Sequence, residues 1–251
     1  MLEHGFLSHN SDIIRSMVKK VLVSLTSTDN PDWDKNIADL KKYNVQEFAL
    51  FLTLLHDERE RQKIYCLIKK TLPNAKIPFL HIHQLIASDE LNFLISEFGA
   101  EMFNLHTARE FPLVYDYKQF RDRILIENSG PAIADGLKES DIEGFAGVCL
   151  DVSHLEKSRL KGFPGYDITI ATLQKYPVLA NHISAIVKKP LFYSGRSHDL
   201  AAHKFTKLAQ FDYLKRYPAE YFGKFIAIEL INPIKEQLEA QKYIEKIIYA
   251  L

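Results

Sequence analysis

The chain has 251 residues, a length that suits one α/β barrel or two domains of average size. Its 32 Lys and Arg residues balance its 32 Asp and Glu residues, so the formal net charge at pH 7 is zero. This balance argues against a general attraction to nucleic acid or to anionic membranes. No apolar run approaches the roughly 20 residues that span a bilayer, and residues 1–10 lack the basic region of a signal peptide. We therefore expect a cytoplasmic protein with no membrane partner.

Two cysteines are present, Cys66 in a helical pattern and Cys149 inside an apolar strand pattern. In a cytoplasmic protein such residues are typically reduced and behave as small apolar side chains. We expect apolar fillers here, neither a disulfide nor a pair of metal ligands.

The first half of the chain alternates between strand and helix patterns. Residues 1–16 have no clear period and are expected to form an N-terminal extension to a domain over residues 17–251. Short apolar runs typical of buried strands lie at 21–26, 47–53, 77–83, 102–106 and 124–127. Amphipathic helical patterns separate them at 30–41, 57–72 and 88–98, and the aromatic-rich segment 111–120 indicates a further short helix.

The second half is less regular. Residues 128–146 predict a connector with one short helical piece near 140–145, and a strand pattern follows at 147–151. The glycine and proline loop over 162–166 could be a lid or a plain connector. Further patterns predict a helix at 167–179, a strand at 183–188, a helix at 208–217, a strand at 225–229 and a last helix over 232–251.

Eight strand patterns alternating with helices predict parallel strands joined by right-handed crossovers. The expected fold is a single-domain α/β structure, the (β/α)8 TIM barrel. An open doubly wound sheet is the alternative. It is disfavoured because the chain has no G-x-G-x-x-G after a strand and no phosphate-loop lysine motif.

Polar residues close many of the predicted strands. In a parallel barrel the carboxyl ends of the strands converge on one mouth, so these residues are the site candidates. Carboxylates crowded there resist burial unless cations accompany them, which predicts a divalent metal ion. Imidazole and carboxylate ligands suit zinc or manganese and allow magnesium or iron. The candidates are His81, His83, His106, Glu127, Asp151, His154, Lys188 and Glu229.

Three short motifs carry a family resemblance: Ile126-Glu127-Asn128, the stretch from Cys149 to His154, and Ile228-Glu229. Together they resemble strands five, six and eight of the xylose isomerase-like barrels, which include sugar isomerases, epimerases and endonuclease IV. The resemblance implies that Glu127, Asp151, His154 and Glu229 bind metal. It also places His106, together with His83 or His81, where the endonuclease branch has histidines for additional metals.

The predicted end of strand seven departs from this family pattern. The family usually has a histidine there, whereas this chain has Lys188 in the predicted strand. His203, or else His198 or Asp199, could supply a replacement ligand. The alternative is a decayed site in which Lys188 provides the positive charge. Lys188, Lys204 and the loop with Arg196 could also bind a substrate phosphate, and a solvated basic loop is the simpler reading.

The resemblance supports three functional hypotheses. The first is a metal-dependent isomerase or epimerase of a small sugar, polyol or sugar phosphate. Glu127 and Glu229 would transfer protons, while His83, His106, Lys188, Arg196 and His198 would bind substrate. The second is an endonuclease IV-like phosphodiesterase, disfavoured by the neutral charge. The third is a non-catalytic barrel that binds a ligand. The expected partner is a small carbohydrate, and assembly into a homo-oligomer is left open.

Overall fold

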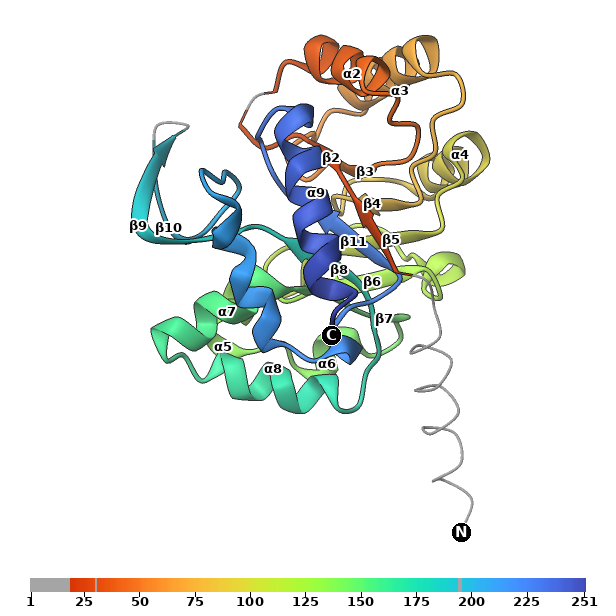
Figure 1. Ribbon diagram of the computed structural model, residues 1–251. Coiled ribbons are helices and arrows are strands. Elements are labelled where there is room, and N and C mark those ends of the chain that lie inside the picture. Colours follow the sequence, from red (N-terminus) through yellow and green to blue (C-terminus); the bar gives the residue numbers. More distant parts are fainter. Residues whose placement is uncertain (1–18, 30, 194–195) are drawn as a thin grey trace.

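The computed structural model describes residues 19–29, 31–193 and 196–251, which form a single (β/α)8 barrel (Figure 1). The predicted extension over residues 1–16 lies outside the described residues. Parallel pairing joins nine strands in one sheet. They are β1 (Lys20–Leu22), β2 (Ser24–Thr26), β3 (Ala49–Phe51), β4 (Phe79–His81), β5 (Met102–Leu105), β6 (Ile124–Glu127), β7 (Gly147–Asp151), β8 (Val178–Ile183) and β11 (Phe225–Ile228).

The barrel closes through its first strand, which is split at Val23 into two short segments. β1 pairs with β11, whereas β2 pairs with β3 on the other side, so the two ends of the sheet are consecutive in the chain. Closure removes the free sheet edges that an open sheet would expose. The predicted barrel is therefore confirmed, and the doubly wound alternative is excluded.

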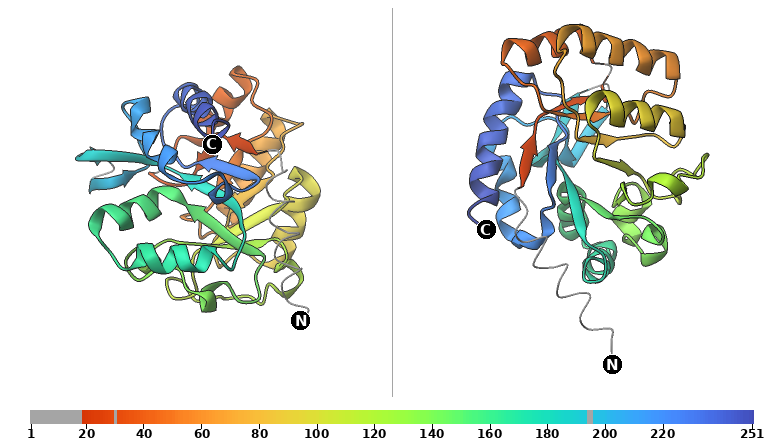
Figure 2. Two further views of the ribbon diagram at one scale, coloured as in Figure 1. Left: turned by 60° about the horizontal axis from the view of Figure 1, so that its bottom comes forward. Right: turned by 90° about the vertical axis from the view of Figure 1, so that its right-hand side faces the viewer.

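Helices surround the strands (Figure 2) because their apolar faces need the outer surface of the sheet as a partner. Isoleucine and leucine side chains on α2, α3, α4 and α9 are buried there. The α-helices are α2 (Trp33–Lys42), α3 (Glu58–Thr71), α4 (Ser88–Phe98), α5 (Pro131–Asp135), α6 (Glu139–Ile142), α7 (Val152–Lys161), α8 (Gly165–Leu173) and α9 (Ile234–Ile248). The 3-10 helices are η1 (Lys118–Phe120), η2 (Leu208–Arg216) and η3 (Ala219–Tyr221).

The prediction for strand seven was wrong. The structure places that barrel strand at Val178–Ile183, and the chain leaves the barrel after Ile183. Asn181 and His182 interrupt the apolar run, which made this segment look like the end of a helix. Both are nevertheless fully buried. The burial of Asn181 is compensated by its hydrogen bonds with the backbone of Leu150, Tyr221 and Gly223. Lys188 therefore does not end a barrel strand.

An antiparallel hairpin follows strand seven. It consists of β9 (Ala185–Tyr193) and β10 (Arg196–Ala202) and projects from the barrel, at the left of Figure 1. Asp199 on the hairpin lies 2.8 Å from Lys161 and 3.7 Å from Lys157 of α7, which ties the hairpin to the helix after strand six. Among the helices of the described residues, none combines the length and apolar character needed to cross a bilayer.

A buried ion pair joins α3 to α4 beside the barrel mouth. Arg61 and Glu90 are 1% and 6% exposed, and two N–O distances of 2.7 Å give the pair a bidentate geometry. Tyr65 donates a further hydrogen bond to Glu90, and Arg61 also donates to the carbonyls of Leu55 and His56 in the loop after β3. The pair therefore fixes a loop at the mouth as well as two helices.

Replacing Glu90 with Gln should lower the free energy of unfolding by about 3 kcal/mol, because the buried Arg61 charge loses its partner. The matched control is Glu97→Gln, which removes the half-exposed ion pair with Lys69 and should cost less than about 1 kcal/mol. Urea unfolding of both variants measures the two effects. Equal, small losses would show that the buried pair does not hold α3 and α4 together.

Candidate metal centre at the barrel mouth

The candidate site is a polar layer directly above an apolar layer in the barrel interior. Side chains two residues apart on a strand face the same side of a sheet. Each of five strands uses this spacing to place an apolar residue in the lower layer and a metal-binding type above it. The pairs, lower residue first, are Phe79 and His81, Leu125 and Glu127, Cys149 and Asp151, Ala180 and His182, and Ala227 and Glu229.

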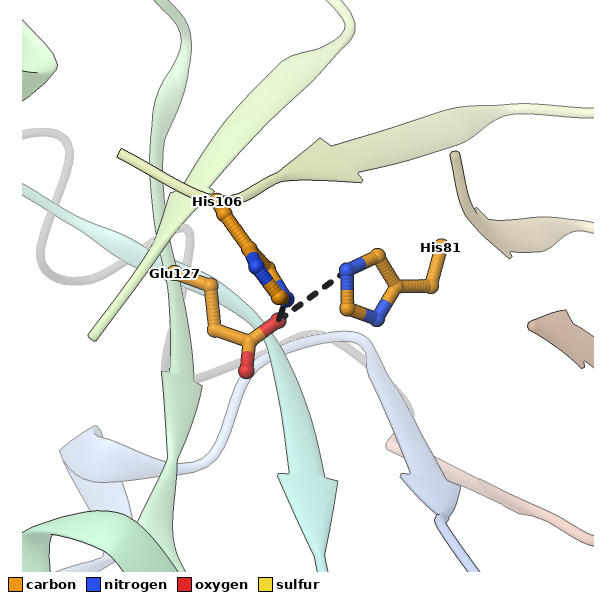
Figure 3. A group of neighbouring side chains, drawn as sticks. All are labelled: His81, His106 and Glu127. Atoms are coloured by element: carbon orange, nitrogen blue, oxygen red, sulfur yellow. Dashed lines mark ion pairs between the residues drawn. The ribbon is translucent and has the colours of Figure 1, made fainter. Parts of the chain in front are cut away.

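His81, His106 and Glu127 form the first group of possible ligands. Both histidines point toward the Glu127 carboxylate (Figure 3), with His81 Nε2 at 3.5 Å and His106 Nε2 at 4.0 Å from the same Oε2 atom. Asn104 donates a 2.8 Å hydrogen bond to that oxygen and orients the carboxylate. His106 Nδ1 lies 3.2 Å from Glu110, a second carboxylate that can fix the ring orientation.

Asp151 and His154 join Glu127 in the second group. Asp151 caps α7, and its Oδ1 accepts hydrogen bonds from the His154 backbone and the Ser153 hydroxyl. The other oxygen, Oδ2, faces His154 Nδ1 at 3.3 Å, and the same nitrogen lies 3.8 Å from Glu127 Oε1. Asn128 brackets the Asp151 backbone with two hydrogen bonds. Asp151 therefore caps the start of α7 with one carboxylate oxygen and presents the other to the site.

His182, Asp151 and Glu229 form the third group, and sequence reasoning missed His182. Its Nδ1 atom lies 3.1 Å from Glu127 and 3.9 Å from Glu229, so both glutamates approach the same ring nitrogen. The Phe51 ring packs against the imidazole with a centroid separation of 4.7 Å. The family pattern predicts a histidine near the end of strand seven. His182 would have matched that pattern if the strand had been predicted at Val178–Ile183.

His203 approaches the site from outside the barrel strands. It follows the β9–β10 hairpin, and its backbone N–H donates to the Tyr193 hydroxyl at 2.8 Å. Its Nε2 atom lies 3.7 Å from Glu229. The hairpin therefore positions a histidine at the mouth, and the Tyr193 hydroxyl holds it there. The structure places His203 beside one of the two predicted catalytic glutamates.

The three groups are linked because Glu127 and Asp151 each belong to two of them. Within each group, one ligand atom per residue lies within 4.8 Å of the others. Several of these atoms are buried without a hydrogen-bond partner, namely both ring nitrogens of His81 and His182, His154 Nδ1 and Asp151 Oδ2. Buried polar groups are normally satisfied. Unsatisfied nitrogen and oxygen atoms that converge in this way suit a divalent cation.

Charge in the layer is compensated between neighbours. Burial opposes ionisation of Glu127, yet His182, His81 and His106 together outweigh burial and hold the pKa of this carboxyl well below its ordinary value. Burial likewise opposes a charge on His182, but Cys149 and Glu127 raise its pKa well above the ordinary value. Burial lowers the pKa of His81 well below normal. His81 is therefore neutral, which is the form of imidazole that binds metals.

Above the polar layer lies a cavity of about 240 Å³, here called the mouth cavity. Histidines and carboxylates line its floor, and the hydroxyl residues Thr28, Thr53 and Ser129 line its wall. Among the described residues, no lysine or arginine lines it. The mouth cavity is therefore small and suited to a ligand with hydroxyl groups.

Three predicted substrate residues, His83, Lys188 and His198, are absent from the lining of the mouth cavity. His83 lines an adjoining cavity of about 140 Å³ with His56 and Phe111, and it is His81 that joins the centre. Lys188 is exposed on β9, and His198 stacks on Tyr193 in the hairpin with a ring separation of 3.7 Å. Arg196 begins β10, and its side chain lies outside the described part of the structure.

Comparisons with known proteins find similar structures. No model of a protein family matches the chain, and no curated protein does. Among solved structures it is similar to a xylose isomerase domain protein from Planctomyces limnophilus, with 10% identity over 94% of this chain and 100% of that one and a TM-score of 0.48. Endonuclease IV from Thermus thermophilus shares 13% identity over 92% and 100%, with a TM-score of 0.44.

A third similar structure is the 3-keto-D-glucoside 4-epimerase from E. coli in its apo form, with 11% identity over 92% of this chain and 99% of that one and a TM-score of 0.41. Similarity at this level does not select a reaction, because one barrel fold hosts many chemistries.

The two cysteines should differ sharply in reactivity, because both are free but Cys66 is exposed and Cys149 is buried. Burial raises the pKa of the Cys149 thiol to about 12, which keeps it protonated and unreactive. A brief treatment with iodoacetamide should add one label at Cys66, and the second label should require denaturant. Mass spectrometry counts the labels. Rapid double labelling of the folded protein would contradict the buried position of Cys149.

Proposed function

We propose that the protein is a divalent-metal-dependent isomerase or epimerase of a small, uncharged carbohydrate or polyol. The observation that carries the proposal is the set of three ligand groups that share Glu127 and Asp151 at the floor of the mouth cavity. Histidine and carboxylate donors of this kind suit zinc or manganese. Because imidazole nitrogens and a carboxylate oxygen are buried there without hydrogen bonds, the residues fit such an ion.

The ligands that fit a metal are Glu127, Asp151, His182 and Glu229, with His154, His81 and His106 around them and His203 beside Glu229. When bound, the ion would supply a Lewis acid that polarises a substrate carbonyl or hydroxyl. Asn104 holds Glu127, and the α7 cap holds Asp151, so both carboxylates are oriented before substrate arrives.

Glu127 and Glu229 are the proposed proton-transfer residues. Both line the mouth cavity and both approach His182, at 3.1 Å and 3.9 Å from its Nδ1 atom. One carboxylate removes the proton next to a carbonyl and the other returns a proton, which changes either the position of the carbonyl or a stereocentre. His154 and His106 also line the mouth cavity, where their ring nitrogens can hydrogen-bond substrate hydroxyls.

The lining of the mouth cavity supports a neutral substrate. A volume of about 240 Å³ accommodates a small molecule, and Thr28, Thr53 and Ser129 offer hydroxyl groups to it. A phosphate would call for lysine or arginine, but Lys188 lies on the hairpin and Lys204 lines a different cavity. We therefore favour a free sugar or polyol over the sugar phosphate considered from sequence.

A phosphodiesterase is the second candidate, and the pair His81 and His106 favours it. These histidines form a ligand group with Glu127 that is additional to the groups around Asp151, so the site can hold more than one ion. Several ions can together activate water and stabilise a leaving oxygen in phosphodiester hydrolysis. The absence of lysine and arginine from the described cavity lining counts against a nucleic acid substrate.

Protein purified without chelators should contain about one or more equivalents of zinc, manganese or iron per chain, because the ligand groups are preformed. Glu127→Gln and Asp151→Asn should each lose most of this metal, since each changes a residue shared by two groups. Glu143→Gln, an exposed change far from the mouth, is the control and should keep it. Elemental mass spectrometry gives the metal content. Metal-free wild-type protein after reconstitution would refute the proposal.

Proton transfer can be tested separately from metal binding. When a panel of aldoses, ketoses and polyols is incubated in D2O, the active substrate should gain deuterium at the carbon that loses its proton, detected by NMR. Glu229→Gln should abolish the exchange because it removes a proposed base, and Glu143→Gln should not. Cleavage of an oligonucleotide at an abasic site into ends with a free hydroxyl and a phosphate monoester, without deuterium exchange into sugars, would favour the second candidate.

A further inference from the structure

Cys149 lies directly beneath the metal centre. It precedes Asp151 by two residues on β7, so both side chains face the barrel interior and the cysteine occupies the layer below. Parallel pairing sets Cys149 opposite Glu127 on β6 and opposite Ala180 on β8, two residues before His182. The side chain is fully buried.

The cysteine sulfur takes part in a further ligand group. Cys149 Sγ, one ring nitrogen of His182 and one carboxylate oxygen of Glu127 lie within 4.8 Å of one another. Donor atoms bound about 2.0–2.3 Å from one tetrahedral ion are roughly 3.3–3.8 Å apart, so only a small contraction would bring these three onto an ion. Both ring nitrogens of His182 are buried and neither makes a hydrogen bond of good geometry, although Nδ1 lies 3.1 Å from Glu127. Once the imidazole gives up its extra proton, one of these nitrogens can bind such an ion.

We propose that Cys149 is a sulfur ligand at the buried end of the centre and binds an ion together with His182 and Glu127. The inference rests on the proposed metal dependence and adds to it a thiolate ligand that the carboxylate and histidine pattern did not include. On binding, the S–H bond of Cys149 breaks and an S–metal bond forms, and His182 gives up its extra proton to become a neutral ligand; both protons leave to solvent. The charge of the ion is unchanged, so no oxidant or reductant is needed.

A thiolate ligand alters which metal the centre selects. Thiolate is a soft donor that favours zinc and cobalt over manganese and magnesium, which prefer oxygen. With carboxylates and imidazoles alone, the centre suits both zinc and manganese. Cys149 therefore specifies zinc, and Cys149→Ala should lower the ratio of the Zn²⁺ to the Mn²⁺ binding constant in competition titrations.

Titration with Co²⁺ tests the ligand directly, because visible d–d bands report bound cobalt and a near-ultraviolet charge-transfer band reports a thiolate on it. Wild-type protein and the control Cys66→Ala should give both kinds of band. Cys149→Ala should keep the d–d bands and lose the charge-transfer band. A charge-transfer band that survives in Cys149→Ala, or is absent from wild-type protein with bound cobalt, would overturn the proposal.

The two proposals fail in distinguishable ways. Cobalt d–d bands without a charge-transfer band would leave a metal centre intact and make Cys149 an apolar filler. Absence of all bands would refute metal binding and the sulfur ligand together. A second measurement does not depend on the folding of the Cys149 variant. In zinc-loaded Cys66→Ala protein Cys149 is the one remaining cysteine, and X-ray absorption should show a sulfur atom about 2.3 Å from the zinc. A shell of nitrogen and oxygen alone would overturn the inference.

Discussion

The central constraint on this structure is the burial of carboxylates and histidines in one layer of the barrel. Glu127, Asp151 and His182 are each no more than 1% exposed, and an isolated charge at such a depth would be costly. Neighbours compensate them: His182 lies 3.1 Å from Glu127, Asn104 donates to the same carboxylate, and the α7 backbone donates to Asp151. The residual unsatisfied atoms are those that a cation would bind.

The apolar layer beneath makes this polar layer rigid. Phe51, Phe79 and Phe225 fill the barrel interior, and the His182 ring packs against the first two. Barrel interiors are close-packed in this way, so the ligand side chains have little freedom to move. Closure through the split first strand completes the ring on which the layers depend. A functional centre placed on strands is held more precisely than one placed on loops.

The hairpin after strand seven contributes a residue to the site without disturbing the barrel. β9 and β10 lie outside the sheet, are tied to α7 through Asp199, and end beside the mouth at His203. The Tyr193 hydroxyl holds the backbone of His203 at the point where the hairpin rejoins the barrel. Segments that follow the carboxyl ends of the strands are the usual place where barrels build their active sites.

Local sequence determined the barrel and much of its site. Alternating apolar runs and helical patterns predicted seven of the eight strand positions, and Glu127, Asp151 and Glu229 were identifiable because a charged residue closes an apolar run. These features depend on neighbours in the chain, which a sequence displays directly. The same pattern placed Cys149 and Asp151 on one face of their strand.

Tertiary structure decided the rest, because register and depth are set by pairing between distant segments. His81 and His83 have the same alternation, so only the end of β4 at residue 81 determined which one enters the centre. The sequence did not indicate His182 as a ligand, because polar residues interrupt the apolar pattern of its strand. Hydrogen bonds from Asn181 to Leu150 and Tyr221 stabilise this polar strand in the barrel. The convergence of His203 on Glu229, and of Cys149 on His182, likewise depends on contacts between segments that the sequence does not relate.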